Sequence, residues 1–222
     1  RQLNRQRAFL ETAAEVEQFD RYRQMAVSLL SDEKTQKAFD VLNVEDKLQE
    51  RYGKNAFGWS LLMAAQLVEA GVSLVQVNLG NNEAWDTHGN AFPSLKNYLF
   101  PPTDRAVSAL LDDLQSRGLL DETLIVMAGE FGRTPKLNNR NGRDHYPNVF
   151  SAAVAGGPVQ GGRVVGSSDS KGAYPLNNPK SPQDVLATMY RHLGIDPHKH
   201  YLDHSGRPIA TLPYGKPIEE LG

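Results

Sequence analysis

The sequence predicts an α/β fold with a largely parallel sheet sandwiched by helices. Helical patterns at 58–71 and 104–118 alternate with apolar runs of strand length at 72–80 and 122–129. The run 122–129 (ETLIVMAG) is apolar almost throughout, as expected for an inner strand that is covered on both faces. Helices and strands that alternate along a chain are typical of parallel sheets.

Residues 1–52 are expected to form an N-terminal helical arm. Phe9, Ala13 and Val16 recur at steps of four and three residues, which is the spacing of one face of a helix. The pattern breaks close to residue 53, and residues 53–222 are expected to form the α/β domain.

The remaining elements follow from local signals. The segment 72–80 (VSLVQVNLG) is short, β-rich and bounded by glycine, so we expect a strand. A third strand is expected at 149–156. The last helix is expected at 181–194, because Ser181 suits the N-cap and Gly194 suits the position after the helix.

The composition narrows the classes of protein to which the chain can belong. Of the 222 residues, 40% are hydrophobic and 23% are charged, which is typical of a globular protein with a sizeable core. The formal net charge of −2, without a basic stripe, argues against a nucleic-acid partner. The lack of cysteine excludes disulfides and cysteine-ligated zinc, and no apolar run reaches the roughly 18 residues of a membrane span.

Polar side chains cluster where the predicted strands end, which is where open α/β sheets bind their ligands. Asp86 and His88 follow the strand 72–80. Residues i and i+2 of an extended segment point the same way, so this carboxylate and imidazole can converge on one cation. Such mixed ligands suit zinc, manganese or iron better than calcium. The alternative is a turn that Asp86 caps.

Glu130 and Arg133 come directly after the strand 122–129. One interpretation is an ion pair of Glu130 with Arg133 or Arg143, in which the charges neutralise each other. The other is that Glu130 binds a metal and an arginine is left to clamp an anionic substrate.

Asp144 and His145 lie in the next polar cluster, GRDHYP (142–147). They form either an inert hydrogen-bonded pair in a loop, or a further metal ligand with its supporting neighbour. The intervening residues 136–141 are expected to be only a solvated excursion. The other histidines are expected to be structural or surface residues: His192, His198, His200 and His204.

Several stretches resemble a known family. The stretch 105–135 is similar to sulfatases and related enzymes of the alkaline phosphatase superfamily, in which a helix, a turn and an apolar strand lead to an acidic metal-binding loop. More closely, WDTHGN, GEFGRTP, GRDHYP and AGGPVQGG occur together in order and resemble the DUF1501 family, bacterial proteins of unknown function that are often exported. The resemblance covers nearly all of residues 38–222.

This resemblance implies an alkaline-phosphatase/sulfatase-like fold whose N-terminal part this chain lacks. It implies a divalent metal ion as cofactor: zinc, manganese or calcium. The ligands would be Asp86, His88, Glu130 and His145. Arg133 or Arg143 would hold the anionic group of the substrate, and Asp144 would orient His145.

The expected activity is hydrolysis of a sulfate or phosphate ester, on a small molecule or a polysaccharide, in the periplasm or outside the cell. Two departures from the superfamily favour a one-metal or altered site: Asp86 and His88 have the spacing D-x-H rather than D-x-x-x-H, and Phe131 stands where those enzymes place a second ligand. The region that carries their nucleophile also has no counterpart here, although Ser60, Ser73 and Thr134 are available hydroxyls. The alternative is a non-catalytic exported binding or scaffold domain.

Overall fold

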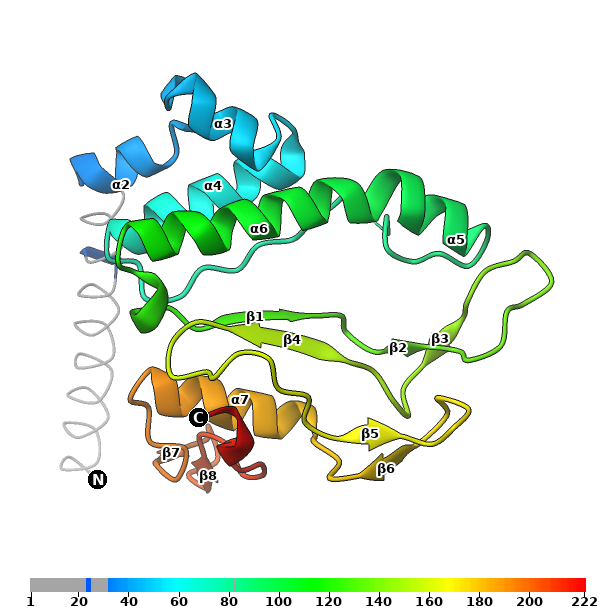
Figure 1. Cartoon of the computed structure of the whole chain (residues 1–222). Helices are drawn as coiled ribbons and strands as arrows, with labels where there is room; N and C mark the ends of the chain where they lie inside the picture. The colour runs from blue at the N-terminus through cyan, green and yellow to red at the C-terminus, as the bar shows by residue number, and fades with distance from the viewer. Residues whose placement is uncertain (1–22, 25–31, 82) are drawn as a thin grey trace, which may run out of the picture.

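A layer of helices carries the hydrophobic core (Figure 1). The structure, a computed structural model, describes residues 23–24, 32–81 and 83–222. The two longest helices of this part, α4 (Ala56–Glu69) and α6 (Phe100–Ser116), pack against each other. Shorter helices lie beside them: α2 (Glu33–Ala38), η1 (Val41–Asn43) and α3 (Asp46–Tyr52). The fully buried side chains of Tyr52, Leu62 and Leu114 lie at the centre of this core.

Local sequence determines how α3 and α4 meet. Asn55 caps α4, because its Oδ1 accepts hydrogen bonds from the N–H groups of Phe57 and Gly58 at 3.0 and 3.2 Å. Gly58 permits the close approach of the two helices, since a Cβ there would lie 2.4 Å from the carbonyl oxygen of Tyr52. Any larger residue at position 58 would push the end of α3 off the core.

A buried polar contact joins α3 to α6. The Tyr52 hydroxyl donates a hydrogen bond to Asp113 Oδ2 at 2.9 Å, and Asp113 also accepts two hydrogen bonds from Arg117 at 2.8 Å each. Burial, and then the negative charge of Asp113, raise the pKa of Tyr52, so the phenol remains a donor. The carboxylate of Asp113 is therefore buried with its charge compensated.

The predicted parallel sheet is wrong. In the described residues every strand pairs antiparallel with one neighbour, in four sheets of two strands. The pairs are β1 (Ile125–Ala128) with β4 (Ala152–Ala155), β2 (Gly132–Arg133) with β3 (His145–Tyr146), β5 (Ser167–Ser168) with β6 (Pro175–Asn177), and β7 (His200–Leu202) with β8 (Pro208–Ala210).

The chain between β1 and β4 explains this outcome. Parallel neighbours need a crossover of a dozen or more residues, usually a helix, to bring the chain back to the starting edge. Here residues 129–151 contain only loops and the β2–β3 pair, so the chain turns back and β4 lies antiparallel to β1. The sandwiched sheet of a sulfatase-like fold is therefore not what these residues form.

The segment 72–80 is extended but is not a strand in the described structure. It runs under α6, in the same direction as β1 (Figure 1). Its apolar side chains fit the prediction, but a strand also needs a hydrogen-bonded partner, which the sequence of one segment does not specify.

The remaining helices are α7 (Pro182–His192), which the sequence predicted at 181–194, and short connecting elements, which it did not predict. A short helix α5 (Ala91–Ser94) and a π-helical turn η2 (Leu95–Leu99) lead into α6, and η3 (Leu120–Glu122) leads into β1. Ser181 and Asp184 form a reciprocal capping box at the start of α7, as the serine predicted. The chain ends in η4 (Glu219–Leu221), beside α7 (Figure 1). Among the described residues, no helix is both long and apolar enough to cross a membrane.

The predicted helical arm falls largely on residues 1–22 and 25–31, which lie outside the described residues. The domain boundary near residue 53 stays a prediction.

Replacing Tyr52 by phenylalanine is expected to lower the free energy of unfolding by about 2 kcal/mol, because a buried hydrogen bond to a charged group is lost. Urea denaturation measures this change. The control is Tyr98→Phe, at a tyrosine that is 73% exposed, for which we expect a change within about 0.5 kcal/mol. Equal midpoints for the two variants would contradict the assignment of Tyr52.

The C-terminal end is expected to be held in a pH-dependent way. Glu220 accepts hydrogen bonds from Lys180 at 2.8 and 3.1 Å and from Asn178 at 2.7 Å, and these lower its pKa to about 2. A carboxyl group with a lowered pKa stabilises the fold above its unfolded pKa, near 4.5, and loses that contribution as the pH falls towards 2. Glu220→Gln should therefore lower the Tm at pH 7 but much less at pH 3. Glu45→Gln, at an exposed glutamate, is the matched control.

Candidate metal centre

Two chain segments meet at the candidate site. One is the loop that carries Asp86 and His88, and the other is the β2–β3 pair, in which Arg133 lies directly opposite His145. Residues opposite each other in an antiparallel pair have side chains on the same face, so these two side chains are neighbours. A hydrogen bond from Arg143 N to Thr87 O, at 3.0 Å, fixes the first segment against the second.

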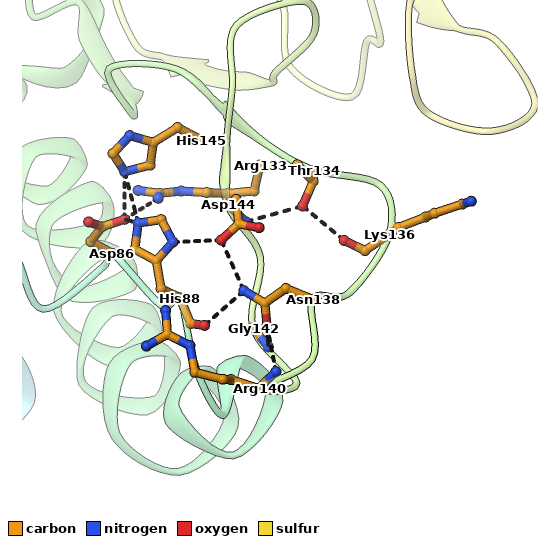
Figure 2. A network of polar contacts seen from close by, with 10 residues as sticks. All are labelled: Asp86, His88, Arg133, Thr134, Lys136, Asn138, Arg140, Gly142, Asp144 and His145. Carbon is orange, nitrogen blue, oxygen red and sulfur yellow. Dashed lines mark hydrogen bonds and ion pairs between the residues drawn. The ribbon is translucent and has the colours of Figure 1, made fainter.

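Three potential ligand atoms converge between these segments (Figure 2). His145 Nε2 lies 2.8 Å from Asp86 Oδ1, and His88 Nε2 lies 3.1 Å from the same oxygen. The two Nε2 atoms are 3.2 Å apart. Asp86, His88 and His145 are thus a possible metal-binding triad. Asp86 and His88 lie close together as expected, but the chain turns between them rather than being extended, because His88 N donates to Asp86 O at 2.9 Å.

The donor set and its spacing fit a divalent metal. In a site with bonds of about 2.0–2.1 Å, neighbouring ligand atoms lie roughly 3.0–3.4 Å apart. Two of the three distances here, 3.1 and 3.2 Å, fall in that range, and the third, from His145 Nε2 to Asp86 Oδ1, is shorter at 2.8 Å. Two imidazole nitrogens at 3.2 Å repel each other through their lone pairs unless a proton or a cation lies between them. One carboxylate and two imidazoles suit zinc or manganese, and three protein ligands leave further coordination positions open.

Asp144 supports His88 from the side opposite the triad. His88 Nδ1 lies 2.8 Å from Asp144 Oδ1, so the Nδ1–H tautomer leaves the Nε2 lone pair facing Asp86 and His145. The hydrogen bond from His88, followed by that from Asn138, lowers the pKa of Asp144. The resemblance implied that Asp144 orients His145, but in the structure its partner is His88.

Asn138 organises the loop 136–141, which was predicted to be only a solvated excursion. Its Nδ2 donates to Asp144 Oδ1 and to the carbonyl oxygen of His88, each at 2.9 Å, and its Oδ1 accepts from the N–H groups of Arg140 and Gly142 (Figure 2). The prediction for 136–141 was therefore wrong at this residue. The available signal was the tendency of asparagine to bond to backbone groups nearby in turns.

Gly142 is required at this point. A Cβ on Gly142 would lie 2.0 Å from the carbonyl carbon of His88, so only glycine lets the two segments come this close. The glycine of the motif GRDHYP is thus part of what positions His88.

Arg133 is held beside the triad. Its guanidinium donates to Asp86 Oδ1 and, at 3.3 Å, to Glu130 Oε1, and it lies 5.3 Å from the ring centre of Phe131. Burial by itself would raise the pKa of Asp86, but the hydrogen bonds from His145 and Arg133 outweigh it and lower the pKa. Asp86 therefore stays ionised, which a metal ligand requires.

Other predicted site residues lie outside the triad. Glu130 is 62% exposed and pairs with Arg133, which is the ion-pair interpretation of the sequence. Arg143 turns away and donates to the carbonyl oxygens of Thr134 and Pro135 at 2.5 and 2.7 Å. Phe131 packs on His145, with ring centres 4.3 Å apart.

The remaining histidines lie apart from this cluster. His192 Nε2 contacts the backbone at Leu124 N and Glu122 O, at 3.3 and 3.1 Å, as expected of a structural residue. Three further histidines are exposed: His198, His200 and His204. Within the described residues, the triad is the one group of three or more potential ligands close enough to hold a metal.

Fold and site together define a protein of mixed helices and short antiparallel sheets with a possible Asp–His–His metal centre. The chain belongs to the DUF1501 family: the family model, described as "Protein of unknown function (DUF1501)", matches residues 1–221. The resemblance of the sequence motifs to this family is thereby confirmed. Searches of curated proteins and of solved structures gave no match.

The protein is expected to bind one equivalent of Zn²⁺ or Mn²⁺, measured by isothermal titration and by metal analysis after dialysis. His88→Ala and His145→Ala should abolish binding, because each removes one of three ligands. Asp144→Ala should weaken binding about 10–100-fold, because it releases the His88 ring. His198→Ala, at an exposed histidine outside the triad, is the matched control. Stoichiometric binding that survives in both His88 and His145 variants would place the metal elsewhere.

Proposed function

We propose that this protein is a metal-dependent hydrolase of sulfate or phosphate esters, exported to the periplasm or beyond, with Asp86, His88 and His145 as the metal ligands. The observation that carries the proposal is the position of Arg133, whose guanidinium lies against a triad of potential ligands. A cation site with an adjacent arginine suits an ester with anionic oxygens.

The metal would polarise an ester oxygen and lower the pKa of a coordinated water. The residues of the chain supply the rest. Asp144 keeps the proton of His88 on Nδ1, and Asn138 fixes Asp144 in turn. Phe131 packs on the ring of His145 and covers one face of it. The three ligand atoms are therefore held in place before the metal arrives.

Arg133 has the properties of an anion clamp. Its side chain is 21% exposed, so it is partly shielded from water yet open to a substrate. Two carboxylates and the Phe131 ring hold the guanidinium in one orientation, and its planar donors match two oxygens of a sulfate or phosphate. A metal at Asp86 would weaken the hold of that carboxylate on Arg133 and free donors for the substrate.

A second candidate function is a non-catalytic binding or scaffold domain. It is favoured by the placement of two hydroxyls that the sequence offered as nucleophiles. Ser60 donates to Ala56 O within α4 at 2.7 Å, and Thr134 donates to Lys136 O at 2.8 Å while accepting from Asp144 N. Neither is activated by a base. The hydrolase proposal therefore relies on water as the nucleophile.

Arg133→Ala is expected to separate metal binding from turnover. It removes a competitor for Asp86 Oδ1, so metal affinity should stay equal or rise, whereas kcat/KM on the aryl ester should fall at least about 100-fold. Assays with aryl sulfates and aryl phosphates, in the presence of Zn²⁺ or Mn²⁺ and after EDTA treatment, measure the turnover.

Lys136→Ala is the matched control, because it removes an exposed cation from the same loop. It should leave both metal binding and turnover unchanged. Stoichiometric metal binding without turnover of any ester in the panel would support the scaffold function and reject the hydrolase.

A further inference from the structure

A large apolar cleft separates the helical layer from the β1–β4 pair. Its volume is about 2510 Å³, and it is lined by α6, α7, β1 and the extended segment 72–80. Apolar side chains such as Leu74, Val107 and Leu111 line its walls, and Leu74 is 65% exposed. An exposed apolar surface of this size usually marks a binding site.

The segment 73–79 forms one edge of the cleft and has unpaired backbone groups. In the described part of the chain, residues 73–78 make no backbone hydrogen bond, although their side chains alternate as in a strand. Val77 and Leu79 pack on the helical core, whereas Gln76 and Asn78 are exposed. The segment therefore has the conformation and the amphipathic pattern of a strand but lacks its partner.

β1 forms a second edge of the same cleft. Among the described residues it pairs only with β4, so the other edge of β1 offers free N–H and C=O groups. Ile125 of β1 packs on the same helical core as Val77. Figure 1 shows β1 and the segment 72–80 running in the same direction, with α6 on one side of β1 and α7 on the other.

In the described residues, the unpaired N–H and C=O groups of the segment 73–78 and of β1 limit what can fill the cleft. Covering such groups without hydrogen-bonding them is costly, so the occupant of the cleft should bring polar groups as well as apolar surface. A polypeptide backbone does both.

We propose that the cleft binds an extended, apolar polypeptide strand, which pairs along the segment 73–79, along β1, or between the two. Addition of a strand to an exposed edge is a common mode of peptide recognition. The seven residues 73–79 can pair over roughly 23 Å, the length of an ordinary strand. Because helices cover both faces, the bound strand should carry apolar side chains on both faces.

A second copy of the chain is a poor occupant. Its own strand-forming segments, 73–79 and β1, are anchored to its helical core through Val77, Leu79 and Ile125. They would have to leave that core to enter the cleft of a neighbour. The occupant is therefore a strand from a separate polypeptide of a different sequence.

The test uses a fluorescein-labelled peptide of about eight residues, with valine, isoleucine and threonine between terminal lysines. Fluorescence polarisation with the full chain should show saturable binding at micromolar concentration. The same peptide with alternate N-methylated residues keeps its side chains but loses the donors of one edge, and should bind at least about tenfold more weakly. Hydrogen exchange of the amides of 73–79 or of β1 should slow at least about tenfold when the unmodified peptide is bound.

Val75→Pro removes one backbone N–H donor from the segment 73–79, and it should weaken peptide binding at least about tenfold if the peptide pairs with this segment. The control Val75→Thr keeps the N–H donor and should bind the peptide nearly as well as the wild type does. Should Val75→Pro not fold, as judged by circular dichroism, the N-methylated peptide still decides. Equal binding of the two peptides, or no binding, overturns the proposal. Protection of the amides of 73–79 and β1 from hydrogen exchange without added peptide would also overturn the proposal. Protection that does not depend on protein concentration would mean that the chain itself closes the cleft. Protection that rises with protein concentration would mean that a second copy fills it.

Discussion

The short antiparallel pairing of Gly132–Arg133 with His145–Tyr146 is the contact on which the candidate metal centre depends. It brings together two residues that lie twelve positions apart and turns both side chains towards Asp86. The loop between them then folds back on Asn138, whose amide holds Asp144 and the backbone of His88. The hydrogen bond from Arg143 N to Thr87 O adds a third connection between the two segments.

In the proposed function, the carboxylate of Asp86 is where metal binding and anion binding would meet. It accepts hydrogen bonds from His145 and Arg133, and it lies 3.1 Å from His88 Nε2. In the absence of a metal, the guanidinium compensates the negative charge. In the proposed hydrolase, a bound metal would share that charge, and Arg133 would gain donors for an anion. A single oxygen thus couples the two halves of the proposed site.

The helical layer and the strands differ in how completely they are covered. The side chains at the centre of the core, Tyr52, Leu62 and Leu114, are fully buried, and the buried carboxylate of Asp113 is paired with Tyr52 and Arg117. The strands lie across an open cleft from this core, with unpaired backbone and exposed apolar side chains. The fold therefore has one surface at which a further strand would complete both the packing and the hydrogen bonding.

Much of the local structure could be predicted from the sequence. The amphipathic pattern marked α6, the apolar run that ends at Gly71 marked α4, and Ser181 and Gly194 marked the ends of α7, because these signals act within a few residues. The motifs also predicted the family, and the family model that matches residues 1–221 confirms this prediction. The sequence also predicted that Asp86 and His88 lie close together, although the chain turns between them rather than being extended.

Only the tertiary structure decided which segments pair and which side chains meet. The sheet is antiparallel because residues 129–151 turn back without a crossover helix, and the segment 72–80 has no strand partner in the described residues. Glu130 faces solvent, and Asp144 pairs with His88 rather than with His145. The physical reason is that helix signals are local, whereas strand pairing and the partners of a charged side chain depend on residues far along the chain.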